Sequence, residues 1–125
     1  MIKIPEEVLN AWKKRQGPVV LTTISKQGIP NSIYATCAEL FDGNKVLVAN
    51  NKFYKTYNNI LECDNAVILF ITDDMKAYQF KGTISYKTEG KEFDDMKKWN
   101  PPHLAGKGVA IFDVQEIYAG AEKTV

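Results

Sequence analysis

Residues 77–87 alternate apolar and polar side chains more regularly than any other part of the chain. A period of two predicts a strand with one face in the core and the other toward solvent. Gly82 interrupts the apolar face, which indicates a bulge or a close approach of another group to the backbone. The segment therefore favours a β-rich fold. The apolar face would carry Tyr78, Phe80, Ile84 and Tyr86.

Other short segments also have the composition of strands. Residues 66–71 are continuously apolar, which predicts a strand covered on both faces. Residues 31–40 alternate like a half-buried strand, and the turn at 41–44 would join them to the next strand as a hairpin. The segments concerned are 18–25, 31–40, 45–49, 66–71 and 108–119.

Short helices are expected at 5–16, 53–62 and 90–99 from their apolar spacing and their flanking Gly and Pro residues. The chain order is then helix, three strands, helix, two strands, helix, strand. With 125 residues this predicts one domain, residues 1–125, that is mainly β with short helices. About six antiparallel strands favour a small barrel over a parallel sheet. A βαβ dinucleotide fold is not expected, because no glycine-rich turn follows the first strand.

The charge balance and composition exclude several classes of protein. The net charge is +1 and 45% of the residues are hydrophobic, as in ordinary globular domains. This balance argues against a nucleic-acid partner, which would require a basic surface. No apolar run approaches the length of a membrane span. Residues 1–7 lack the apolar core of a signal peptide, so a cytoplasmic protein without a membrane partner is expected.

The cysteines and the histidine do not form a recognisable catalytic or metal-binding motif. Cys37 and Cys63 are far apart, and with His103 as the only histidine they make neither a disulfide framework nor a zinc site. No nucleophile motif accompanies His103. We therefore expect free thiols that act as packing groups, and assign no catalytic or metal-binding residue.

Lys52, Lys55 and Thr56 fall in the first turn expected for helix 53–62. Backbone N–H groups at a helix N-terminus attract phosphate, and two ammonium groups and a hydroxyl add further donors. Cations are otherwise slightly unfavourable at this end of a helix, which indicates a bound anion, although lysines near a helix start are also common on solvated faces and that alternative stays open. The sequence predicts an anion pocket here. The apolar face of this helix would carry Phe53, Tyr57, Ile60 and Leu61.

Several motifs follow one another along the chain: Pro-Asn-Ser-Ile-Tyr-Ala at 30–35, Asp-Gly-Asn-Lys-Val-Leu-Val at 42–48, Lys55-Thr56 with Asn59, and Phe-Lys-Gly-Thr at 80–83. In this order they resemble the split-barrel flavoproteins related to pyridoxamine 5′-phosphate oxidase. The similarity is greatest to the small FMN-binding proteins of that group. It covers nearly the whole chain and implies a six-stranded antiparallel split β-barrel that binds FMN.

The resemblance also implies which residues would contact the flavin. The ring and ribityl side would lie against the second strand, the next strand would offer backbone donors and acceptors, and the loop and helix after it would hold the phosphate. In that order the residues are Ser32, Ile33, Tyr34 and Ala35; Val48, Ala49, Asn50 and Asn51; and Lys52, Lys55 and Thr56. The resemblance further implies a homodimer with the flavin at the interface.

Two departures from the family pattern affect the expected function. The small FMN-binding proteins often carry an Asn-Thr-Trp-Asn type segment where this chain has residues 32–35, so contacts of the flavin with backbone groups are expected there. True pyridoxamine phosphate oxidases carry a C-terminal Arg-x-His element, whereas this sequence ends in Lys-Thr-Val. Oxidation of vitamin B6 is therefore not expected.

Three functions follow from these observations. The first is a flavin-dependent oxidoreductase or an electron carrier with a small-molecule or protein redox partner. In that case the chemistry belongs to the flavin, because Tyr34 and Cys37 are the nearest acid–base candidates and both are expected to pack. The second is a non-catalytic binding module for a deazaflavin or haem on the same barrel. The third is a barrel without cofactor that acts as an assembly partner.

Overall fold

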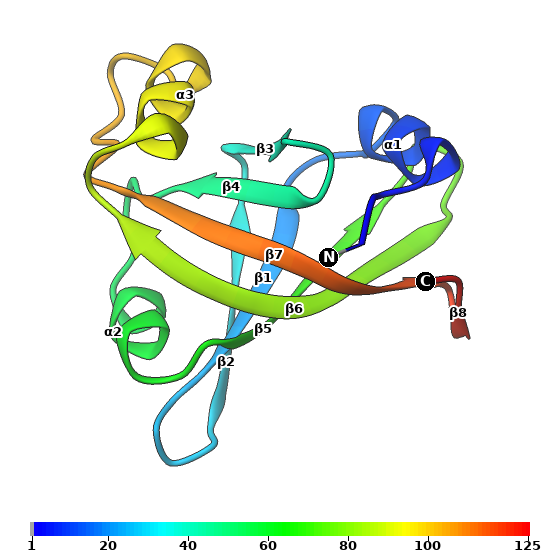
Figure 1. The fold of residues 1–125 in the computed structure, drawn as a ribbon, viewed down its shortest axis with the longest axis horizontal. Coiled ribbons are helices and arrows are strands. Elements are labelled where there is room, and N and C mark those ends of the chain that lie inside the picture. Colours follow the sequence, from blue (N-terminus) through cyan, green and yellow to red (C-terminus); the bar gives the residue numbers. More distant parts are fainter. Residues whose placement is uncertain (1) are drawn as a thin grey trace.

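The computed structural model describes residues 2–125, in which eight strands form one antiparallel sheet in the order β2-β1-β5-β6-β7-β4-β3, with β8 paired to β7. The sheet curls into a split barrel, and β6 and β7 cross in front of β1, β2 and β5 (Figure 1). The helices are all too short to span a bilayer. The elements are α1 (Glu6–Lys13), β1 (Val19–Ile24), β2 (Pro30–Ala35), β3 (Ala38–Phe41), β4 (Lys45–Ala49), α2 (Lys55–Glu62), β5 (Asn65–Ile71), β6 (Ala77–Lys87), α3 (Lys91–Trp99), β7 (Val109–Ala119) and β8 (Glu122–Lys123).

The mainly β split-barrel fold is confirmed, but the expected six strands become eight. The single strand predicted at 31–40 is in fact two, because the chain bends at Thr36 and Cys37 and moves from one edge of the sheet to the other. Before the bend, β2 pairs with β1; after it, β3 pairs with β4 as the predicted hairpin. The strand β8 was not predicted, since two polar residues carry no strand pattern.

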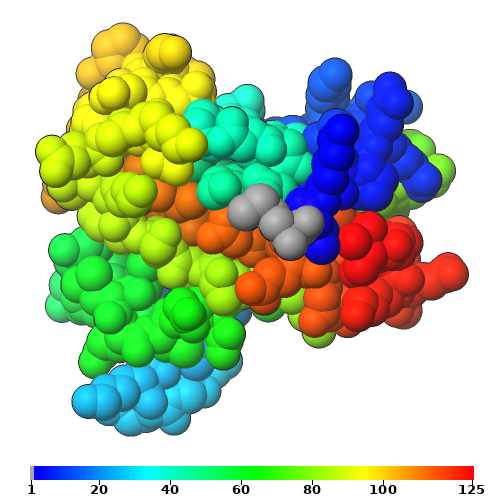
Figure 2. All heavy atoms as spheres, viewed as in Figure 1, coloured from blue at the N-terminus to red at the C-terminus, as the bar shows by residue number. Residues whose placement is uncertain are grey.

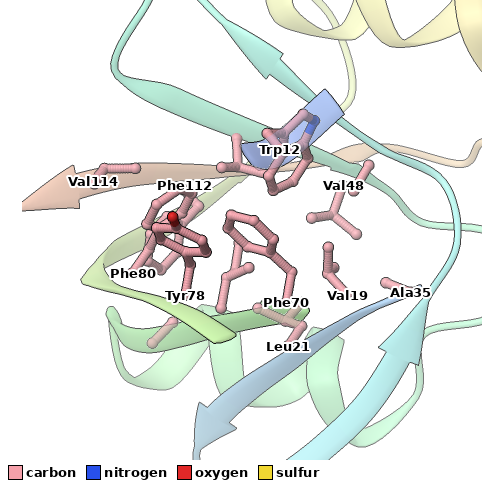
Figure 3. Close-up of a cluster of buried hydrophobic side chains, with 14 of the residues drawn as sticks. Trp12, Val19, Leu21, Ala35, Val48, Phe70, Tyr78, Phe80, Phe112 and Val114 are labelled. Atoms are coloured by element: carbon pink, nitrogen blue, oxygen red, sulfur yellow. The ribbon is translucent and has the colours of Figure 1, made fainter. Parts of the chain in front are cut away.

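Aromatic side chains fill the barrel interior. Trp12 from α1 stacks on Phe80, with ring centroids 6.2 Å apart, and meets the edge of Phe70 at 5.1 Å. Phe112 completes the cluster from β7, and all these side chains point into the same interior (Figure 3). The guanidinium of Arg15 lies 4.3 Å from the Trp12 ring centroid and donates to the Ala38 carbonyl. Helix α1 is thereby joined to the β3 edge.

The long alternating strand β6 has the predicted form. Tyr78, Phe80 and Ile84 are buried, and the pairing with β7 shifts register between Lys81 and Gly82. A Cβ atom at Gly82 would overlap the carbonyl oxygen of Asp113 on β7. Both features expected of this glycine, a bulge and a close backbone approach, are confirmed.

Two predictions about side-chain burial and helix limits are wrong. Strand β5 is not covered on both faces: its burial alternates, and Leu69 is 41% exposed because the sheet is a single layer there. Helix α2 begins at Lys55, so Lys52 and Phe53 precede it, and Leu61 is 60% exposed instead of packed. The apolar run of β5 is therefore buried on its inner side only.

Candidate functional site

A cavity of about 360 Å³ opens where the β2 edge, the loop after β4 and the loop before β7 meet. This volume lies within the range of small-molecule sites. The residues from β2 and β4 in the cavity wall are mostly apolar. The loop after β4 adds an amide group and an ammonium group. The lining residues are Ile33, Tyr34, Ala35, Thr36, Cys37, Ala49, Asn51, Lys52, Phe53 and Leu104.

A second hollow of about 230 Å³ adjoins this cavity on the side of α2. The two share Ile33, Lys52 and Phe53, and the second reaches Lys55 and Thr56 at the start of the helix. The first N–H groups of a helix have no intrahelical acceptor, and Tyr54 at the N-cap adds no side-chain acceptor within the described residues. The combined space therefore leads from an apolar slot to a positively charged end.

The lysines at this end are available to a ligand. Neither Lys52 nor Lys55 takes part in the ion pairs found among residues 2–125. Both side chains are exposed and border the second hollow. Ammonium groups placed beside free backbone N–H groups favour an anion. This end of the site suits a phosphate or carboxylate group.

Asn50 shapes the loop after β4 from a buried position. Its Oδ1 accepts from the Phe53 backbone N–H at 2.9 Å, and its Nδ2 donates to the Tyr86 hydroxyl at 2.7 Å. Only 5% of Asn50 is exposed. Both ends of the Asn50 amide therefore help to hold the loop, and Phe53 is placed against the cavity as a result.

Asn51 joins this loop to the loop before β7. Its amide and that of Asn100 donate to each other, each at 3.0 Å, and its Oδ1 also accepts from the Gly106 N–H at 2.8 Å. The loop that carries Leu104 to the cavity lies between Asn100 and Gly106. This reciprocal amide pair therefore positions one wall of the cavity against another.

Most of the predicted flavin contacts come together around this space. The exceptions are Ser32, Val48 and Asn50. Ser32 points to the outer face of the sheet, where its hydroxyl lies 2.8 Å from that of Thr22, and Val48 is fully buried. The predicted residues that border the space are Ile33, Tyr34, Ala35, Ala49, Asn51, Lys52, Lys55 and Thr56.

The backbone donors expected after β4 are already used within the chain. The N–H of Ala49 donates to the Cys37 carbonyl at 3.0 Å, and the N–H of Asn50 donates to the Gly108 carbonyl at 2.9 Å. The cause is that β4 has a neighbour on each side, β3 and β7. A ligand here would contact the side chains of this loop more than its backbone N–H groups.

Sequence reasoning missed several residues at the site. Thr36 could have been found, because it directly follows the segment predicted to line a ring and precedes Cys37, which the sequence already placed near that ring. Leu104 and Asn100 carry no local signal, since they reach the site only through the path of the loop before β7. Asn31 and Phe53 border the second hollow from beside predicted positions.

The arrangement suits binding more than acid–base catalysis. Besides Lys52, only the Tyr34 phenol and the Cys37 thiol among the cavity-lining groups can exchange a proton. Residues 2–125 contain no cluster of three or more metal-ligating side chains. The site therefore fits a flat, partly apolar ligand with an anionic tail, whose own chemistry would have to carry any reaction.

Comparison with known proteins agrees with this fold. The family model for pyridoxamine 5′-phosphate oxidase matches residues 5–119. The chain belongs to that family. An uncharacterised protein of Methanocaldococcus jannaschii is 34% identical over 125 residues, spanning 94% of this chain and 81% of that relative.

Several solved structures share this fold. HupZ of Group A Streptococcus superimposes with a TM-score of 0.85 at 23% identity, covering 98% of each chain. An FMN-binding protein of Syntrophomonas wolfei gives 0.74 at 20% identity, over 87% of this chain and 80% of that one. An F420 reductase superimposes with a TM-score of 0.70 at 13% identity, covering 92% of this chain and 98% of that one. HutZ, the haem storage protein of Vibrio cholerae, superimposes with a TM-score of 0.68 at 15% identity, covering 94% of this chain and 95% of that one. At these identities the likeness concerns the fold.

Proposed function

We propose that the protein binds FMN and acts as a flavin-dependent oxidoreductase or electron carrier. The observation that carries the proposal is the pair of adjoining hollows, one an apolar slot and the other at the cationic start of α2, that share Ile33, Lys52 and Phe53 in their walls. Ile33, Ala35 and Ala49 would pack against the ring, and Lys52 and Lys55 would bind the phosphate. Bound FMN would supply the redox chemistry, which requires no protein nucleophile.

The first test is the visible spectrum of the purified protein, with mass identification of any compound released by heat. A flavin spectrum and released FMN support the proposal; a colourless protein that fails to take up added FMN contradicts it. Stopped-flow reduction with nicotinamide donors then separates the two roles. Reduction no faster than that of free FMN would exclude the reductase and leave the electron carrier.

Lys55→Ala tests the phosphate position. A charge-assisted contact is worth about 1.5–3 kcal/mol, so FMN affinity should fall roughly ten- to hundredfold. Lys13→Ala is the matched control, because it removes the same charge from an exposed position on α1, which lies across the molecule from α2 (Figure 1). An unchanged affinity of the Lys55→Ala variant would place the phosphate elsewhere.

A deazaflavin is the second candidate ligand. It would present a similar flat ring to the slot and a phosphate to the lysines, and an F420 reductase shares the fold. Haem is less well supported by the residues at the site. His103, Met75 and Met96 do not line the cavity, so the described residues offer no imidazole or thioether ligand to iron there.

A homodimer is part of the proposal. On the outer face of the sheet Val20 lies between Tyr34 and Leu69, which are 79% and 41% exposed. Adjacent exposed apolar groups favour an interface, and Tyr34 also lines the cavity, so a second copy on this face would border the ligand. Sedimentation should show a dimer that Leu69→Glu dissociates and Leu61→Glu, on α2, does not. A wild-type monomer would contradict this.

A further inference from the structure

A separate hollow of about 440 Å³ lies beside β7, at the opposite end of β4 from the cavity. The cavity is bordered by Ala49, the last residue of β4, and the hollow by Lys45, the first. Among the described residues none lines both spaces. Strand β7, in orange, crosses the face of the molecule shown in Figure 2, between β4 and the C-terminal residues. The hollow is therefore distinct from the candidate site and large enough for a small molecule.

An interruption in the pairing of β7 creates this hollow. Strand β4 pairs with β7 as far as Asp113, and β8 pairs with the same edge of β7 only from Tyr118 onward. Within residues 2–125 no strand pairs with that edge between these two points. On its other edge β7 pairs with β6 through a bulge, in which Gln115 is the extra residue. A bulge redirects a side chain out of the regular alternation, and Gln115 lines the hollow.

Asn44 gives the hollow a buried acceptor that the described residues leave unpaired. Asn44 lines the hollow and is 7% exposed, and its Oδ1 is buried without a hydrogen-bond partner. Its backbone is held in place, because its N–H donates to the Phe41 carbonyl at 3.4 Å and its carbonyl accepts from the Val114 N–H at 3.1 Å. A buried acceptor without a partner is costly and uncommon, so a donor brought by a ligand would be stabilising here.

Two side chains of opposite charge border the same hollow. Lys45 Nζ and Asp113 Oδ1 are 3.7 Å apart, which is longer than a hydrogen bond, and the two side chains are 18% and 47% exposed. Both groups therefore keep hydrogen-bonding capacity for a ligand. They are the only charged residues of the lining, to which Thr83 and Gln115 add a neutral hydroxyl and a neutral amide. The charges balance, so the hollow suits a ligand that carries one charge of each sign.

We propose that this hollow binds a free α-amino acid with an aliphatic side chain. The ammonium group of the amino acid donates to the Asp113 carboxylate and to Asn44 Oδ1, and its carboxylate accepts from Lys45 Nζ. The contacts with Asp113 and Lys45 join opposite charges and are therefore the stronger ones. The apolar members of the lining, Ile2 and Val114, contact the aliphatic side chain. This inference does not depend on the flavin proposal.

Isothermal titration calorimetry of the purified full chain tests the site with valine, leucine and isoleucine. At least one of the three should bind with a Kd below about 1 mM. The N-acetyl derivative of that amino acid has no ammonium group and its methyl ester has no carboxylate, so each should bind about tenfold or more weakly. If none of the three amino acids binds, or if both derivatives bind as tightly as the parent, the inference is wrong.

Asp113→Asn and Asn44→Ala locate the binding in the hollow. The first removes the charge that the ammonium group contacts and the second removes the buried acceptor, so each should raise the Kd about tenfold or more. Glu116→Gln, on the same strand but outside the hollow, is the matched control and should leave the Kd within about twofold. Asp113→Asn preserves the shape of a half-exposed side chain, so it decides the matter even if Asn44→Ala does not fold. An unchanged Kd in Asp113→Asn, or an equal loss in Glu116→Gln, would overturn the inference.

Discussion

The barrel interior and the wall of the cavity are held together by different forces. In the interior, Trp12, Phe70 and Phe80 contact one another through their rings and are at most 4% exposed. In the cavity wall, Asn51 and Asn100 hold two loops together through side-chain amides. Apolar packing is strong but tolerant of small shifts, whereas hydrogen bonds fix distance and direction.

The difference predicts which property each region controls. Loss of a ring from the interior removes buried apolar area and leaves a void, so it should lower the stability of the whole chain. Loss of an amide from the wall removes little area and should act mainly on the position of the loops around the ligand. Substitutions in the two regions can therefore be sorted by comparing stability with ligand affinity.

Phe80→Ala should have the largest effect. Phe80 is fully buried, and truncation of a buried phenylalanine costs about 3–5 kcal/mol. Urea unfolding followed by circular dichroism measures the loss. The molecules that remain folded should bind FMN with nearly unchanged affinity. A fall in their affinity as large as that produced by Asn100→Ala would break the distinction between the two regions.

Gly82→Ala should be the next most damaging change. The added Cβ would meet the Asp113 carbonyl across the β6–β7 pair, so the strands must separate locally, at a cost of about 1–3 kcal/mol. Ser85→Ala, at an exposed position of the same strand, is the matched control and should change the free energy of unfolding little. Equal unfolding midpoints for the two variants would contradict this, because they would mean that β7 moves away from the added Cβ without a loss in the free energy of unfolding.

Asn100→Ala should cost about 1–2 kcal/mol, because the Asn51 amide loses both of its bonds to Asn100. The more telling readout is local. Asn51 Oδ1 accepts from both Asn100 and the Gly106 N–H, so without Asn100 the hydrogen exchange of the Gly106 N–H should accelerate. The affinity for FMN should also fall by more than the loss of folding stability alone explains. Asp95→Ala, which removes the Trp99 indole partner on α3, should leave Gly106 exchange unchanged. Unaltered Gly106 exchange in Asn100→Ala would contradict the positioning role.

Asp74→Asn should have the smallest effect, because Asp74 lies in the exposed turn between β5 and β6. The Thr72 hydroxyl donates to the Asp74 carboxylate and holds its pKa below the ordinary 3.8. The stabilisation is therefore fully present above the ordinary pKa and is lost as the pH falls through the lowered one. The melting temperature should drop slightly at neutral pH and match that of the wild type in strong acid. Asp73→Asn is the control, and a difference that persists in acid would contradict this origin.

The strands of the barrel were largely predictable, since alternation and β-branched residues report on burial and conformation. The misses have physical causes. The bend at Thr36 and Cys37 arises because the sheet closes, which is a property of the whole chain and not of the local pattern. Leu69 is exposed because no described element covers the outer face of β5, although its neighbours in sequence suggest burial.

The candidate site was predictable where one segment supplies it. Residues 33–35 and Lys52, Lys55 and Thr56 follow from motif and helix position, and the structure brings them to one space, where their binding of a flavin stays a prediction. The Asn51–Asn100 pair could not be inferred, because the two residues are 49 positions apart in the sequence. Each asparagine by itself indicates only a loop.

The passage of the chain from β2 to β3 also links ligand binding to folding. Ala35, Thr36 and Cys37 line the cavity, so this wall exists only once the two edges of the sheet have come into place. The unfolded chain has no such wall and cannot compete for the ligand. Any compound that occupies the cavity at a hundred times its Kd would thus add about 2.7 kcal/mol to the free energy of unfolding. A thermal-shift screen would then detect the natural ligand without knowledge of its reaction.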